Sequence, residues 1–327
     1  MSANRVNASP LARHMAEQAG LDLLQITPSG PNGRVIKRDI EAAQKAGGTT
    51  HKAAAPSSQP SSQPSSQSSP NGAALHSGIM PALPDARAYY RPDQYDELPL
   101  DMMRGAIATR LTQSMQQIPH FYLTRTLNID ALMAHRARIN AALAERPLAD
   151  GKVEKISLND LIVRACALAL IDVPEVNVSF AGDAILRHHH ADIGVAVALP
   201  DGLITPIVSQ CDEKPVRAIS TEIKDLAARA AEKRLKPSEY EGGSFSVSNL
   251  GMFGIDQFTA VINPPQAAIL AVGGPVEKWL MRGGAPVSHT EMRVTLSCDH
   301  RAIDGAVGAQ FLATLTDYVE KPLLLSL

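Results

Sequence analysis

Cysteine is scarce in this sequence, with three residues among 327. Cys166, Cys211 and Cys298 stand far apart and form no CxxC pair, so the sequence supports neither a disulfide framework nor a zinc knuckle. Such cysteine usage fits a reducing compartment best.

An excess of charge of one sign is also missing, because 31 basic residues are balanced by 33 acidic ones and the net charge is -2. Such a chain has no global attraction to nucleic acid or to an anionic membrane. We therefore expect neither of them as a partner.

Long apolar runs are absent as well. The stretch 161–173 is interrupted by Arg164 and Asp172 and falls short of the ~18 apolar residues that a membrane span needs. The N-terminal segment lacks the apolar core of a secretion signal. We expect a soluble, cytoplasmic protein. The 45% hydrophobic and 20% charged residues indicate a globular chain of about two structured units.

One segment is too polar to form a core. Residues 56–70 consist only of Pro, Ser and Gln, with PSSQ repeated three times, and Lys52 is the only formally charged residue between Gly47 and Pro84. Such a stretch stays solvated and extended. The sequence therefore predicts a flexible linker over residues 47–94. The alternative is a long irregular surface loop within one domain, which compact domains seldom carry.

A small helical unit precedes the linker, over residues 1–46. Ser9 is a good helix N-cap with Pro10 at the first helical position, and the loop TPSGPNG separates this helix from a second one over 34–45. About 40 residues without a disulfide are near the lower limit for independent folding. Docking is a more plausible role for such a unit than catalysis.

Residues 95–327 mix helix and strand patterns. Apolar periodicity predicts helices over 101–116, 129–144, 158–171 and 218–235. Strand patterns cover 120–129, 193–199, 203–208, 245–247, 267–272 and 293–297. The third helix, 158–171, is apolar nearly all round and is expected to be buried. The fold class is α/β (α+β), with helices packed over one mixed sheet.

The segment LSCDHRAIDGAVGAQFL combines an apolar strand with a polar turn. His300 and Asp304 stand four apart, and their side chains share a face if the turn becomes helical at once. Histidine titrates near neutral pH, so His300 at a strand end is a candidate general base. The alternative is a histidine satisfied by local hydrogen bonds.

The segment EGGSFSVSNLGMFG holds a second candidate. Strand alternation places Ser244, Ser246 and Ser248 on one face and Phe245 and Val247 on the other. Ser248, at the end of the strand, is placed to direct its hydroxyl at a developing oxyanion. A polar strand face followed by a turn is the alternative reading of this segment.

Two further features are weaker. The run His188 to His190 offers possible metal ligands, but consecutive strand side chains alternate faces, so a solvated strand edge is favoured and we expect no metal site. The basic residues of the helix 218–235, Lys224, Arg229, Lys233 and Arg234, favour a solvated face over a phosphate clamp. No glycine-rich nucleotide motif occurs.

Taken together, the motifs resemble those of the dihydrolipoamide acyltransferases, the E2 cores of 2-oxo acid dehydrogenase complexes. DHRAIDG is similar to the family's DHRxxDG motif, and SFSVSNLGMFG and ALPDGLITPIV resemble its serine-bearing strand and its central strand pair. SPLAR followed by SGPNGRVIKRDI resembles the family's peripheral subunit-binding domain. IPHFYLT, at Ile118 to Thr124, is most similar to the acetyl-transferring branch that serves pyruvate dehydrogenase.

The resemblance implies a catalytic domain with the chloramphenicol acetyltransferase fold, assembled as homotrimers within a larger hollow core. It implies an active site between subunits, with His300 as the base that deprotonates the thiol of coenzyme A or dihydrolipoamide. Ser248 of the neighbouring chain would hydrogen-bond the oxyanion, and Asp304 would hold the site in order. No metal is implied.

The resemblance also implies partners. Arg13 and Arg34 match positions with which the family grips acidic surfaces of the E1 or E3 dehydrogenase components, although Glu17 stands where some members have another arginine. Family members normally begin with lipoyl domains, and none is evident before Ser9, so we expect the lipoyl group on another chain or domain. A non-catalytic E1- or E3-binding scaffold and an E2 for succinyl or branched-chain acyl groups remain the alternatives.

Overall fold

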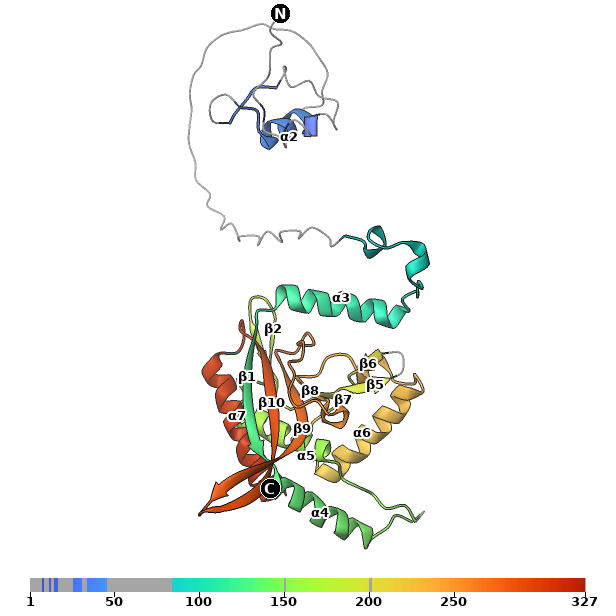
Figure 1. Cartoon of the computed structure of the whole chain (residues 1–327), viewed down its shortest axis with the longest axis vertical. Helices are drawn as coiled ribbons and strands as arrows, with labels where there is room; N and C mark the ends of the chain where they lie inside the picture. Colours follow the sequence, from blue (N-terminus) through green and yellow to red (C-terminus); the bar gives the residue numbers. More distant parts are fainter. Residues whose placement is uncertain are drawn as a thin grey trace, which may run out of the picture. The chain divides into compact units, whose positions relative to one another are not determined.

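The structure is a computed structural model that describes residues 8, 12, 15–16, 26–30, 34–45, 84–149, 151–199 and 202–326. The chain divides into two units, Met1–Pro84 and Asp85–Leu327, which are considered separately (Figure 1). The division into residues 1–46, 47–94 and 95–327 stays a prediction.

In the first unit, the helix α2 spans Lys37–Lys45, within the predicted range 34–45. Its Ile40 packs with Ala8, Ala12, Ala16 and Val35 in a small core. The buried carboxylate of Asp39 accepts hydrogen bonds from the backbone N–H of Ile36 (2.9 Å) and from the N–H and hydroxyl of Ser29. These bonds fix the loop that precedes α2.

The second unit contains five α-helices among its described residues: α3 (Met102–Gln117), α4 (Asp130–Ala144), α5 (Leu158–Asp172), α6 (Val216–Ala231) and α7 (Gly305–Glu320). Short 3-10 helices are η3 (Ala86–Ala88), η4 (Pro92–Gln94), η5 (Pro237–Glu239), η6 (Gly251–Phe253) and η7 (Pro322–Ser326). The predicted α6 extended to residue 235, but Lys233 adopts a positive φ of 57°, which a helix cannot continue through.

Six strands form one mixed sheet in the order β1 (His120–Asn128), β10 (Ala285–Asp299), β9 (Ala268–Arg282), β8 (Phe245–Asn249), β4 (Ile193–Val195) and β7 (Ile207–Val208). The strand β8 is parallel to both β9 and β4, and the other pairs are antiparallel. Two small hairpins lie outside this sheet, β2 (Val178–Phe180) with β3 (Ile185–Arg187) and β5 (Val197–Leu199) with β6 (Gly202–Ile204).

Two predicted strands are divided in the structure, so those predictions were wrong in detail. The range 193–199 becomes β4 and β5, and 203–208 falls into β6 and β7, each pair in different sheets. The predicted ranges 267–272 and 293–297 are only the inner parts of β9 and β10, whose outer parts form a long hairpin (Figure 1).

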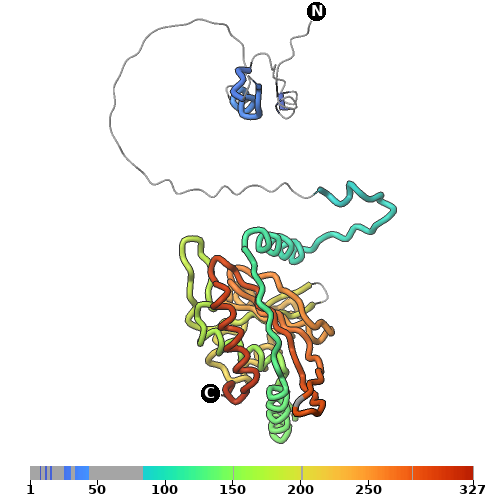
Figure 2. Tube along the Cα trace, turned by 60° about the vertical axis from the view of Figure 1, so that its left-hand side comes forward, coloured from blue at the N-terminus to red at the C-terminus, as the bar shows by residue number. Residues whose placement is uncertain are grey.

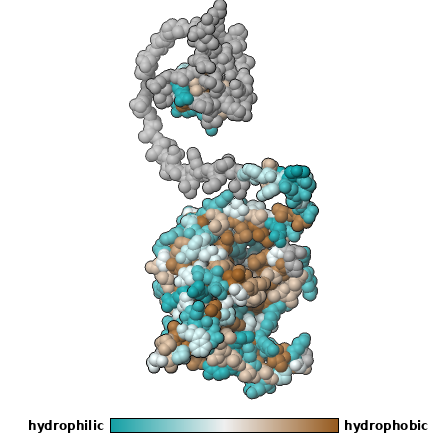
Figure 3. Space-filling view, in the orientation of Figure 1, coloured by the Kyte–Doolittle hydropathy of each residue, from teal (hydrophilic) through white to brown (hydrophobic). Residues whose placement is uncertain are grey.

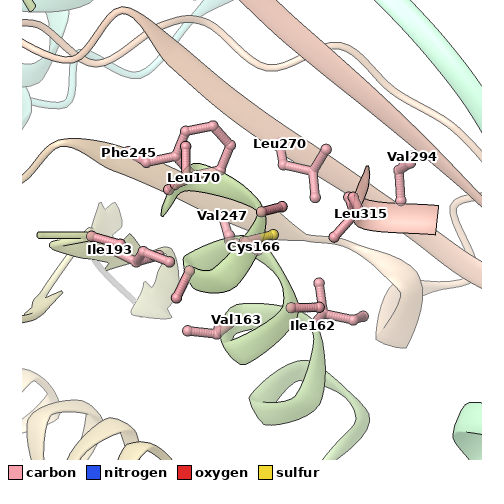
Figure 4. Close-up of a cluster of buried hydrophobic side chains, with 14 of the residues drawn as sticks. Ile162, Val163, Cys166, Leu170, Ile193, Phe245, Val247, Leu270, Val294 and Leu315 are labelled. Atoms are coloured by element: carbon pink, nitrogen blue, oxygen red, sulfur yellow. The ribbon is translucent and has the colours of Figure 1, made fainter. Parts of the chain in front are cut away.

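The main core lies between the sheet and the helices α5 and α7, which Figure 2 shows together on one side of the strands. Figure 4 shows α5 residues such as Ile162 and Cys166 against Val247 and Leu270 of the sheet. Ser157 caps α5 by accepting the N–H of Asp160 (3.1 Å), and Asp160 accepts the N–H of Ser157 in return. The predicted burial of this helix is confirmed.

Candidate active site

His300 follows directly after β10, in a turn that two neighbouring segments hold. Its backbone N–H donates to the carbonyl oxygen of Pro119 (3.0 Å), and the N–H of Asp299 donates to that of Ala267 (2.8 Å). The imidazole packs on the ring of Phe121, with 4.5 Å between the ring centroids. Within the described residues no hydrogen bond occupies either ring nitrogen, and the side chain is exposed. The imidazole of His300 is therefore accessible from solvent.

Asp304 is the N-cap residue of α7, and its carbonyl oxygen accepts the N–H of Gly308 (3.0 Å). Its carboxylate makes no capping hydrogen bond and is exposed. The helix begins only at Gly305, so the condition for a shared helical face with His300 is not met. The residues between them form a turn over 300–302, in which the N–H groups of Ala302 and Ile303 bond back to the carbonyl of Asp299.

Ser248 lies near the end of β8, and its hydroxyl has no hydrogen-bond partner within the described part of the chain. The other two serines of this face differ. Ser244 donates to the carbonyl of Asp192 and accepts its N–H, and Ser246 donates to Gln266 (2.5 Å). Of the three, Ser248 is the one whose hydroxyl is free and half-buried.

The turn after β8 lies directly against β9. A side chain at Gly273 would place its Cβ 2.0 Å from the carbonyl oxygen of Asp256, so only glycine permits this approach. Asn249 fixes the start of the turn, because its side chain accepts the N–H of Gly251 (2.9 Å) and donates to Asn159 of α5 (3.1 Å). Ser248 is thus held in a rigid setting.

His300 and Ser248 lie far apart in one subunit. The register aligns Ser248 with Ala271 of β9 and Ala271 with Thr295 of β10, five residues before His300. With about 3.3 Å per residue and about 4.8 Å between strands, the two positions are roughly 19 Å apart.

The two side chains also lie on opposite faces of the sheet. Val247 faces the helices in the main core, so Ser248 faces away from them. His300 packs on Phe121, which borders that core. A single subunit therefore does not bring the two candidates together.

Burial removes one other nucleophile from the site. Cys298 lies two residues before His300 and is fully buried, and this burial raises the pKa of its thiol to about 12. At neutral pH it stays protonated and unreactive.

The three consecutive histidines do not form a strand edge, since β3 ends at Arg187. His188 shares a hydrogen bond with the hydroxyl of Ser179 (2.9 Å), and His190 bonds to the carboxylate of Asp212 (3.2 Å), which raises the pKa of His190. His190, Asp212 and Glu213 are close enough for a cation, but Asp212 also accepts the N–H of Ala191. When His190 is protonated, it forms an ion pair with Asp212 and Glu213.

The remaining predicted residues lie in the first unit and on α6. Arg34 is exposed, and Arg13 lies outside the described residues. Lys224 donates to the carbonyl of Lys155, and Arg229 binds Asp225 and Glu239. Both side chains thus have partners in the protein. Among the described residues, no helix combines the length and apolar content that a membrane crossing requires.

Sequence reasoning missed the neighbours of His300. Asp299 and Arg301 flank it and bind each other, and Phe121 and Phe180 provide ring contacts to His300 and Arg301. The order of an acidic, an imidazole and a basic side chain in the DHR segment could have indicated the ion pair between Asp299 and Arg301. The ring contacts had no local signal, because they come from strands far away in the sequence.

A family model of the 2-oxoacid dehydrogenases acyltransferase catalytic domain matches residues 92–327. The chain belongs to this family. A second model, the e3 binding domain, matches residues 6–41. The expected fold class, a mixed α/β catalytic domain with a small peripheral subunit-binding domain, is thereby confirmed.

Two curated relatives of this acyltransferase are dihydrolipoyllysine-residue acetyltransferase components of the pyruvate dehydrogenase complex. The protein from Rhizobium meliloti is 48% identical over 98% of this chain, and that from Zymomonas mobilis is 45% identical over 98%. The chain spans 68% and 66% of their lengths. It thus represents about two thirds of such proteins.

Two solved structures have a TM-score of 0.69 to the acyltransferase, and each aligns over 76% of it and over 100% of the solved chain. One is the cubic core of a pyruvate dehydrogenase multienzyme complex, 31% identical, and the other a dihydrolipoamide acetyltransferase from Azotobacter vinelandii, 32% identical. The second was studied for the role of a serine, a histidine and an asparagine in its catalytic mechanism. In that enzyme, 52 positions separate the serine from the histidine, and 4 positions separate the histidine from the asparagine. The same intervals separate Ser248, His300 and Asp304 in this chain.

Proposed function

We propose that this protein transfers an acetyl group between dihydrolipoamide and coenzyme A, as the E2 core of a pyruvate dehydrogenase complex. The observation that carries the proposal is that two polar groups, one in the DHRAIDG turn and one at the end of β8, are available to bind a substrate. The imidazole of His300 and the hydroxyl of Ser248 each lack a partner among the described residues, while polar neighbours are hydrogen-bonded. The intervals shared with the Azotobacter vinelandii enzyme support the same assignment.

The reaction needs a base and an oxyanion donor. A thiol with a pKa of about 8.5 is mostly protonated at neutral pH, so His300 removes its proton and the thiolate attacks the thioester carbonyl. The hydroxyl of Ser248 donates a hydrogen bond to the tetrahedral oxyanion. When this intermediate collapses, the imidazolium returns the proton to the departing thiolate. A base contributes about 10²- to 10⁴-fold and one oxyanion donor about 10²- to 10³-fold.

Asp304 is the third member of the proposed site. In the Azotobacter vinelandii enzyme the residue at this interval is an asparagine, whose amide both donates and accepts, whereas a carboxylate only accepts. Asp304 therefore accepts hydrogen bonds from a partner group or water in the site. The proposal requires no metal.

The site is completed between subunits in this proposal. Because roughly 19 Å of sheet separates His300 from Ser248 in one chain, each active site takes its base from one subunit and its oxyanion donor from the next. Exposed apolar residues such as Met252 (81% exposed) and Phe253 (61%) mark surface that an assembly would cover. Figure 3 shows apolar surface in the upper half of the catalytic unit. Homotrimers within a larger core are the proposed assembly.

The N-terminal unit docks the E1 or E3 dehydrogenase components in this proposal, and the e3 binding domain match supports it. Arg34 is exposed, and Arg13 is its proposed companion in binding acidic groups. The lipoyl group is carried on another chain or a further domain. Replacing Arg34 with Glu should weaken E3 binding, and unchanged affinity at low salt would contradict the role of this residue.

The acyl transfer is tested with purified protein, acetyl-CoA and free dihydrolipoamide, without added metal. We expect acetyl transfer to exceed transfer from succinyl-CoA or a branched-chain acyl-CoA, and His300→Ala to lower kcat at least ~10²-fold. No acyl transfer at all would favour a non-catalytic scaffold. Activity of His300→Ala within a few-fold of the wild type would remove His300 from the mechanism.

A further inference from the structure

The imidazole of His300 is oriented without a hydrogen-bonding partner of its own in the described residues. A catalytic histidine is commonly held by a carboxylate on its second ring nitrogen. Here neither ring nitrogen has such a contact in the part of the chain that the structure describes, and the side chain of Asp304 makes no capping bond that would fix it nearby. The orientation of the base must therefore come from its backbone and from packing.

The residues on either side of His300 bind each other. The carboxylate of Asp299 accepts the backbone N–H of Arg301 (2.9 Å), its Nε (3.0 and 3.2 Å) and a terminal guanidinium nitrogen (2.8 Å). This bidentate ion pair joins the residues before and after His300 and so constrains the backbone of His300. Bidentate pairs of arginine and carboxylate fix geometry more tightly than single ion pairs.

The environment makes this pair firm. The side chain of Asp299 is 2% exposed and that of Arg301 is 33% exposed. The guanidinium carbon of Arg301 lies 4.3 Å from the ring centroid of Phe180 on β2, a cation–π contact. The pair thus links the end of β10 to the β2–β3 hairpin, while Phe121 supports the imidazole from β1.

We propose that Asp299 and Arg301 are positioning residues that set the orientation of the His300 imidazole for proton transfer. The inference rests on the proposed acyl transfer and extends it to two residues that touch no substrate in this account. Arg301 uses both prongs of its guanidinium on Asp299 and one face on Phe180. These contacts assign Arg301 to the support of the base.

The test is steady-state kinetics of acetyl transfer with Arg301→Ala and Arg301→Lys. We expect Arg301→Ala to lower kcat at least ~10-fold, because small displacements of a catalytic group are costly, while both KM values change less than about 3-fold. Arg301→Lys should be intermediate, since an ammonium group cannot bind the carboxylate with two prongs. Methylguanidine should restore part of the kcat of Arg301→Ala and none of that of His300→Ala.

Two controls separate positioning from folding. Arg229→Ala removes a comparably buried, carboxylate-paired arginine on α6 and should lower the melting temperature without lowering kcat. If Arg301→Ala does not fold because it leaves Asp299 buried and unpaired, the double variant Asp299→Asn, Arg301→Gln removes both charges. Native mass spectrometry should show that this double variant still assembles. Its kcat should fall to the extent that is expected for Arg301→Ala.

Failure of the positioning role and failure of the catalytic role of His300 give different kinetic results. If kcat of Arg301→Ala stays within about 2-fold of the wild type, or if only the KM for coenzyme A rises ~10-fold, the positioning role is wrong. If His300→Ala itself remains active, His300 is not the base, and both its proposed catalytic role and the positioning role of Asp299 and Arg301 are wrong, whatever the kinetics of the Arg301 variants.

Discussion

Ser248 differs from Ser246, the other serine of β8, in the hydrogen bonding of its hydroxyl. Ser246 is buried and donates to Gln266, whereas Ser248 is half-buried and its hydroxyl has no partner among the residues that the structure describes. An oxyanion forms only near the transition state, so Ser248→Ala should lower kcat about 10²- to 10³-fold and raise KM much less. Steady-state kinetics measure both constants.

The matched control for Ser248 is Ser246→Ala. It removes a buried hydrogen bond, and we expect it to lower the melting temperature while kcat per folded protein is retained. If Ser248→Ala changes KM and leaves kcat unaltered, Ser248 binds the ground state and is no oxyanion donor.

At the residue scale the sequence predicts His300 and Ser248 as site residues, which stay predictions, but it could not place them relative to each other. Each has a local signal, a polar residue at the end of an apolar strand. Their separation depends on the strand order β10-β9-β8, which arises from pairings between residues far apart in the sequence. The contact of His300 with Phe121 depends on the same long-range pairing.

Among the elements, α3 carries a residue that weakens a helix. Gly105 lies in its first half, and a Cβ at this position would meet nothing within 4 Å. Gly105→Ala should therefore raise stability by about 0.5–1 kcal/mol, because alanine has the higher helix propensity. The control is Gly254→Ala at a positive φ of 75°, which should lower stability. Calorimetry that shows Gly105→Ala destabilised would contradict this account of α3.

The loop before α2 depends on an ionised carboxylate. Hydrogen bonds from Ile36 and Ser29, with that from the N–H of Ile36 the strongest, lower the pKa of Asp39 below its ordinary value of 3.8. Because the folded pKa is depressed, this contribution to stability is present above pH 3.8 and is lost as the pH falls through the folded pKa. An NMR titration of the Asp39 carboxyl should give a midpoint below 3.8. A midpoint at or above that value would contradict the hydrogen-bonded loop.

Elements with strong local periodicity were predictable, and those set by tertiary contacts were not. The helix α5 has an apolar surface and a capping box, and both appear in the sequence. The outer hairpin of β9 and β10 has exposed, mixed residues such as Trp279 (67% exposed), so no alternating pattern marks it. The division of 193–199 into β4 and β5 follows from pairing with different partners, β8 and β6.

At the scale of the whole molecule, the proposed mechanism leaves the catalytic unit incomplete as a single subunit. The proposed base and the proposed oxyanion donor lie on opposite faces of one sheet, and the surface retains large exposed apolar side chains. A resemblance between motifs suggested a site shared by two chains, and the register of β8, β9 and β10 now gives a physical reason for it. The composition of the chain alone contained no sign of this requirement.

The most direct measurement is complementation between two inactive variants, His300→Ala and Ser248→Ala, dissociated, mixed in equal amounts and reassembled. A site shared by neighbouring chains has an intact base and an intact oxyanion donor in about a quarter of random pairings. We therefore predict that the mixture recovers roughly a quarter of the wild-type activity, whereas each variant reassembled alone stays inactive. Mixed trimers, verified by native mass spectrometry, that show no activity above the separate variants would contradict a site shared between subunits.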